Sequence, residues 1–126
     1  MGIHRKISGS TTRAAATGSG SQSITGLGGK PIMVLFSAID DGDSNTYSDG
    51  WDDGINLGCN FINNLNLLAT LLTRATKSHT RSIQVQTNGG DGHSAIISSL
   101  DADGFTLSWT RIGNGRAITI KYLAIL

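Results

Sequence analysis

The sequence predicts an all-β fold: an antiparallel β-sandwich of jelly-roll-like type, with about seven or eight short strands. Gly, Ser, Thr and Asn supply 52 of the 126 residues, and the chain has 14 Ile but no Glu and only four Lys. Residues that favour strands and turns therefore outnumber those that favour helices. Short segments with apolar residues at alternate positions also recur between clusters of Gly, Asn and Asp. A disordered chain is excluded, because 38% of the residues are hydrophobic and the formal net charge is +1.

The first 21 residues predict an extended N-terminal arm rather than part of the domain. They are rich in Ser, Thr and Gly, include three consecutive Ala and show no sustained periodicity. Such an arm would be mobile alone, so we expect it to be held by a neighbouring chain. The expected organisation is an arm over residues 1–21 followed by one β-sandwich domain over residues 22–126.

The first half of the domain predicts strands at 22–26, 31–38, 55–62 and 66–73. Pro31 begins the second of these, where a missing N–H is tolerated. Cys59 lies on the apolar side of the third, which predicts a buried thiol rather than a nucleophile. The leucines from Leu65 to Leu72 also fit helical spacing, but we prefer a strand.

The second half predicts strands at 82–87, 94–99, 104–111 and 116–125. Alternation in the third of these places Phe105 and Trp109 on one face, and we expect them to form core with Tyr122. The triplet Gly113-Asn114-Gly115 supplies the residues of a tight hairpin before the last strand.

The charges are segregated along the chain. Residues 1–39 contain four basic residues and no acid, whereas residues 40–53 contain six Asp and no base. Oxygen side chains in the acidic segment follow the spacing of a calcium-binding loop, although Thr46 replaces the usual Gly and the final position is Asp rather than Glu. We therefore favour a long solvated loop over a Ca²⁺ site, and a contact with the basic arm of an adjacent copy is a third interpretation. The oxygen-bearing residues are Asp41, Asp43, Asn45, Asp49 and Asp52.

Two aromatic residues, Tyr47 and Trp51, lie in the same acidic segment, where no core periodicity requires them. Exposed aromatics in a polar loop suit sugar stacking or a protein interface. The alternative, which we weigh equally, is that they fold back and cap the sandwich.

No catalytic constellation or cofactor site is apparent, so we expect a protein that is not an enzyme and has no cofactor. The histidines, His4, His79 and His93, form no metal-binding pair and are expected at the surface. The near-zero charge argues against a nucleic-acid partner. The sequence contains no long apolar segment and no secretory signal, so we expect no membrane contact and synthesis in a cytosol.

Two stretches resemble structural proteins of tailed bacteriophages. Residues 17–28, TGSGSQSITGLG, followed by KPIMVLF at 30–36, resemble a motif that runs roughly TGNGTSQTITGLGFQPKAVIFF. Residues 99–109, SLDADGFTLSW, followed by KYLAI at 121–125, resemble the closing signature SFDADGFTLNW…YLAL. One departure is that Gly29-Lys30 replaces the Phe-Gln pair before the Pro. The two motifs bracket nearly the whole domain in the right order, while residues 40–93 have no counterpart.

The resemblance implies a phage virion component on a β-sandwich, without cofactor or enzymatic activity. We expect a capsid decoration (cement) protein that binds the assembled shell and stabilises it, as a dimer or trimer. It would be made in the host cytoplasm, with the major capsid protein or another virion protein as partner. The basic residues Arg5, Lys6 and Arg13 would then pair with shell carboxylates.

Two other functions stay open. One is a carbohydrate-binding, receptor-binding tail or lectin-like module, in which Tyr47, Trp51 and the Asp-rich segment form the sugar site, with or without Ca²⁺. The other is a minor tail or neck component.

Overall fold

The computed structural model describes residues 5–67, 70–87 and 90–126, with the backbone alone at 43–45, 63–67 and 70–75. These residues form ten strands and no helix, so the predicted all-β class is confirmed while the number of strands exceeds the expected seven or eight. The strands are β1 (Lys6–Arg13), β2 (Gly20–Ile24), β3 (Met33–Asp40), β4 (Asp43–Asp52), β5 (Leu57–Leu67), β6 (Thr70–Ser78), β7 (Ile83–Gln86), β8 (Gly92–Asp101), β9 (Gly104–Ile112) and β10 (Ile118–Ile125).

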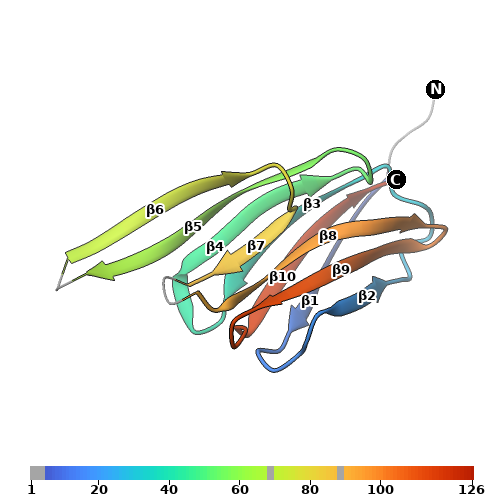
Figure 1. The fold of residues 1–126 in the computed structure, drawn as a ribbon. Helices are drawn as coiled ribbons and strands as arrows, with labels where there is room; N and C mark the ends of the chain where they lie inside the picture. The colour runs from blue at the N-terminus through green and yellow to red at the C-terminus, as the bar shows by residue number, and fades with distance from the viewer. Residues whose placement is uncertain (1–4, 68–69, 88–89) are drawn as a thin grey trace.

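The strands form two antiparallel sheets, as Figure 1 shows. The six-stranded sheet has the order β1-β10-β3-β4-β5-β6, and the four-stranded sheet has the order β2-β9-β8-β7. This arrangement agrees with the predicted β-sandwich, but it does not confirm the jelly-roll type. Nothing in the described part of the chain forms a helix with the length and apolar character of a membrane span.

The core lies between the two sheets and is built by alternation. Strand β3 buries every second residue, and Phe105 of β9 packs edge-on against Phe36 of β3, with 5.8 Å between ring centroids. The ring of Tyr122 also packs edge-on against Phe105, with 5.3 Å between ring centroids, and Trp109 is buried. The predicted core of these aromatics is therefore confirmed. Cys59 is also buried as predicted, and burial raises the pKa of its thiol to about 11.

Strand β1 is the first difference from the sequence prediction. Residues 6–13, expected in a free arm, pair with β10 of the same chain from Lys6 opposite Ile125 to Arg13 opposite Ile118. Residues 6–13 of the expected arm are therefore an edge strand of the domain itself. The sequence gives no apolar alternation here because inner positions carry Gly9, Thr11 and Arg13. A Cβ at Gly9 would collide with the phenol of Tyr122, so the small residue makes room for this ring.

Strand β4 is the second difference, because the Asp-rich segment expected to be a loop lies between β3 and β5 in the six-stranded sheet. Its inner positions are small or polar since β7 of the opposite sheet lies close to them. Ser48 Oγ accepts a 3.2 Å hydrogen bond from the Gln84 N–H. A Cβ at Gly50 would collide with the carbonyl oxygen of Ser82. Because the opposite sheet lies so close, large apolar side chains do not fit at the inner positions of β4. The apolar alternation that would have predicted a strand is therefore missing from the sequence.

The β5–β6 hairpin extends beyond the rest of its sheet (Figure 1). Strand β4 pairs with β5 only as far as Tyr47 opposite Ile62, whereas the β5–β6 ladder continues to Leu67 opposite Thr70. Residues 63–67 and 70–74 therefore form a two-stranded segment, which we call the distal ribbon. The preference for strand over helix is confirmed here, but the bounds 66–73 were wrong: residues 66 and 67 end β5, and β6 begins at residue 70.

Candidate functional site

The outer face of the six-stranded sheet carries the exposed aromatic residues of the Asp-rich segment. Alternation along β4 points Tyr47, Asp49 and Trp51 away from the core. Tyr47 is 37% exposed and Trp51 is 39% exposed, so neither caps the sandwich. The other exposed large hydrophobic residues are Leu35 and Ile39 on β3, Ile32 just before β3, and Ile55 in the β4–β5 connection.

A cavity of about 210 Å³ opens beside Trp51, over strands β4, β5 and β6. Gly58 lies opposite Trp51 in the ladder, and a Cβ at this glycine would lie 3.5 Å from the indole Nε1. This is an ordinary van der Waals distance, so the indole lies close against the backbone of β5 at this position. Glycine within a strand often marks such a close approach.

A row of polar side chains crosses the cavity. Asp49 of β4 is opposite Asn60 of β5, and Asn60 is opposite Lys77 of β6. All three are exposed and line the cavity together with His79. Within the described part of the chain, the side chains of Asp49, Asn60 and Lys77 make no hydrogen bond or ion pair. A carboxylate acceptor, an amide and an ammonium donor are thus available to a ligand.

Of the other oxygen-bearing residues in the Asp-rich segment, Asp41 and Asp52 do not join this row. Asp52 turns inward and is fully buried, and its carboxylate accepts hydrogen bonds of 2.8 Å from the N–H groups of Ile97 and Gly54. Asp41 lies in the β3–β4 turn and accepts a 2.7 Å hydrogen bond from the Thr119 hydroxyl. The side chains of Asp43 and Asn45 lie outside the described residues.

Asp49 and Asp52 therefore do not face a common site, because alternation along a strand sends them to opposite faces. Among residues 5–67, 70–87 and 90–126, no group of three or more His, Cys or Asp is placed to hold a metal ion.

The three basic residues predicted to meet a partner have different environments. Arg5 Nη2 donates a 2.8 Å hydrogen bond to the Gly28 carbonyl of the same chain. Arg13 is buried, with its guanidinium carbon 5.4 Å from the centroid of the Trp109 ring and a 2.6 Å hydrogen bond to the Gly18 carbonyl. Burial also lowers the pKa of Arg13. Lys6 is exposed on the edge strand.

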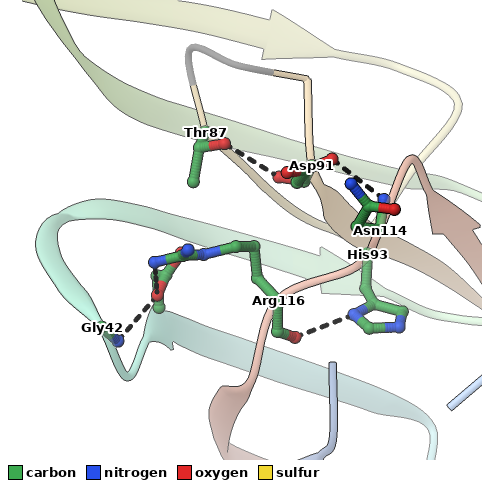
Figure 2. A network of polar contacts seen from close by, with 7 residues as sticks. Gly42, Thr87, Asp91, His93, Asn114 and Arg116 are labelled. Atoms are coloured by element: carbon green, nitrogen blue, oxygen red, sulfur yellow. Dashed lines mark hydrogen bonds and ion pairs between the residues drawn. The ribbon is translucent and has the colours of Figure 1, made fainter. Parts of the chain in front are cut away.

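A buried polar network that the sequence did not predict is shown in Figure 2. His93, expected at the surface, is fully buried, with Nδ1 3.0 Å from the Arg116 carbonyl and Nε2 3.1 Å from the Thr17 carbonyl. Arg116 forms a two-point ion pair with the buried Asp40, at 2.6 and 3.0 Å. These bonds connect β3, β8, the segment before β10 and the β1–β2 connection, which is a structural role.

A second set of hydrogen bonds in Figure 2 joins Thr87, Asp91 and Asn114. The Asp91 carboxylate accepts a 2.9 Å hydrogen bond from the Asn114 N–H, and the Asp91 carbonyl accepts one of 3.3 Å from the Thr87 hydroxyl. Because these groups bond to one another, the exposed row beside Trp51 is the stronger candidate for ligand binding.

Comparison of the chain with protein-family models, curated proteins and solved structures finds no match.

Proposed function

We propose that the chain is a structural protein of a phage virion, a capsid decoration (cement) protein that binds the assembled shell and stabilises it. The two stretches that resemble tailed-phage proteins support this proposal because they pair with each other in both sheets. Strand β2 pairs with β9 in one sheet, and β3 pairs with β10 in the other. The two motifs would therefore define one structural unit.

The observation that carries the shell-binding proposal is the distal ribbon. Its two strands, 63–67 and 70–74, carry four leucines, and the ribbon has no strand beside it from β4. A two-stranded ribbon is marginally stable alone in water. A partner surface that buries its leucines would stabilise it, and each fully buried leucine contributes about 1.5–3 kcal/mol. We therefore assign the distal ribbon, rather than the basic N-terminal residues, as the shell anchor.

The contact of one ribbon is small, so oligomerisation would strengthen it. A shell presents many identical sites, and a dimer or trimer of the chain would engage several of them at once. Linked contacts of this kind raise the overall affinity far above that of one contact. Lys6, exposed at the opposite edge of the sheet, could pair with a shell carboxylate as a minor contribution.

A sedimentation assay with shells that lack the protein tests this function. The double substitution Leu65→Thr, Leu72→Thr changes two residues that are opposite each other in the ladder, and threonine preserves the strand preference. We expect it to weaken shell binding at least about tenfold. Leu35→Thr is the matched control, because Leu35 is 38% exposed on β3, away from the ribbon. The control should bind like the wild type.

Two results would overturn the proposal. One is wild-type protein that does not sediment with the shells. The other is a double variant that folds, by circular dichroism and urea unfolding, and still binds as tightly as Leu35→Thr.

A further inference from the structure

The cavity beside Trp51 lies away from the distal ribbon. Gly58, opposite Trp51, is near the start of β5, whereas the ribbon occupies the end of this strand. Asn60, the lining residue of β5 nearest the ribbon, is three residues from Asn63, or roughly 10 Å along a strand, and Gly58 is nine residues from Leu67, or roughly 30 Å. A molecule anchored through the far end of its ribbon would thus leave the cavity open to other ligands.

The indole supplies one wall of this cavity. Trp51 is 39% exposed, so one part of the ring packs on the sheet while another part faces solvent. A flat, partly exposed indole offers apolar area at low cost in side-chain entropy. The C–H face of a pyranose ring is flat and apolar as well, and it stacks on such a surface.

The polar row supplies the other requirement of a sugar site. Sugar hydroxyls both donate and accept hydrogen bonds, so they need mixed partners. The Asp49 carboxylate accepts, the Lys77 ammonium donates and the Asn60 amide does both. None of these side chains is engaged within the described part of the chain, so a ligand would not have to break an existing bond. An apolar peptide would leave the three polar groups without partners.

We propose that the cavity is a glycan-binding subsite that accepts one pyranose ring, stacked on Trp51 and hydrogen-bonded by Asp49, Asn60 and Lys77. Its volume of about 210 Å³ suits a single ring rather than a longer saccharide. Lys77 and His79 lie on the same rim, so an acidic sugar could place its carboxylate there. Glycan binding is a function in addition to shell binding and is independent of the ribbon.

A glycan array with neutral and acidic pyranose glycans gives the first test, followed by calorimetric titration of the best methyl glycoside. We expect the wild type to bind, and Trp51→Ala to weaken affinity about tenfold or more. Tyr47→Ala is the matched control, because Tyr47 is an equally exposed aromatic on the same strand but does not line the cavity. This control should stay within about twofold of the wild type.

A second variant separates hydrogen bonding from stacking. Asp49→Asn keeps the size of the side chain but removes the charge, and we expect about a tenfold loss of affinity. Ligand should also shift the fluorescence of the exposed Trp51, while the buried Trp109 provides a constant background. The ribbon variant Leu65→Thr, Leu72→Thr should bind the same glycan as tightly as the wild type.

The subsite would be refuted by an array with no bound glycan of either class. It would equally be refuted if Trp51→Ala and Tyr47→Ala bound the sugar alike. Wild-type protein that binds the glycan but does not sediment with the shells would contradict only the decoration function, so failures of the two proposals are distinguishable.

Discussion

Asp52 connects the two sheets, and its substitution gives a direct test of the sandwich. Its buried carboxylate, on β4 of the six-stranded sheet, accepts a 2.8 Å hydrogen bond from the Ile97 N–H on β8 of the other sheet. The β8–β9 register shifts between Ile97 and Ser99. The carboxylate therefore supplies an acceptor to a buried N–H at an irregularity in the β8–β9 ladder. The same carboxylate accepts a second bond of 2.8 Å from Gly54 N–H.

The cost of Asp52→Ala follows from these two bonds. A buried donor left without a partner costs about 1–3 kcal/mol, and this is the fate of the Ile97 N–H. The Gly54 N–H lies nearer solvent, so water can replace much of its lost bond. We expect the free energy of unfolding to fall by about 3 kcal/mol in total. Asp52→Asn retains one acceptor oxygen and should lose about 1–2 kcal/mol.

Urea unfolding measures these differences, and Asp49→Ala is the matched control. Asp49 lies on the same strand but on the outer face, where its side chain has no partner within the described chain. Its loss should change the free energy of unfolding by less than about 0.5 kcal/mol. Hydrogen exchange of the Ile97 amide should accelerate in Asp52→Ala. Equal stability of the Asp52→Ala and Asp49→Ala variants would show that the cross-sheet bond is not made.

Two further predictions concern titratable groups. Burial raises the pKa of Cys59 to about 11, so at pH 8 only about one thiol in a thousand is ionised. A thiol reagent should therefore modify the native protein far more slowly than the urea-unfolded protein. Equal rates would contradict the burial. Hydrogen bonds from Thr106 and then Ser99 lower the pKa of Asp101, so this group stabilises the fold above about pH 4 and loses that effect as the pH falls through its folded pKa. Thr106→Val should therefore reduce the loss of stability between pH 6 and pH 3, measured by urea unfolding, and an unchanged loss would rule out this hydrogen bond as a cause.

The sequence predicts a strand best where one face enters an apolar core. Alternation identified β9, because Phe105, Leu107 and Trp109 all point into the sandwich. It failed for β1 and β4, whose inner residues face a nearby ring or a nearby strand instead of a wide apolar space. Gly50 illustrates the reason: the backbone of Ser82 lies so close that no side chain fits. Close approach between sheets is a property of the assembled fold and leaves no apolar period in the sequence.

The candidate site was predictable only in part. Tyr47 and Trp51 stood out because no core pattern required them, and both are exposed. Asn60 and Lys77 join them only through the register of β5 and β6, which the sequence did not define. His93 was missed because its partners are carbonyl oxygens from distant parts of the chain, and a carbonyl carries no sequence signal.

The abundance of the chain in purified virions tests the proposed function most directly. A decoration protein occupies sites repeated over the whole shell, so its copy number should approach that of the major capsid protein. Quantitative gel densitometry against the major capsid band measures this ratio. A ratio of the same order as the shell subunit is the predicted result. A few copies per particle, as for a tail or neck component, or absence from the particle, would contradict it.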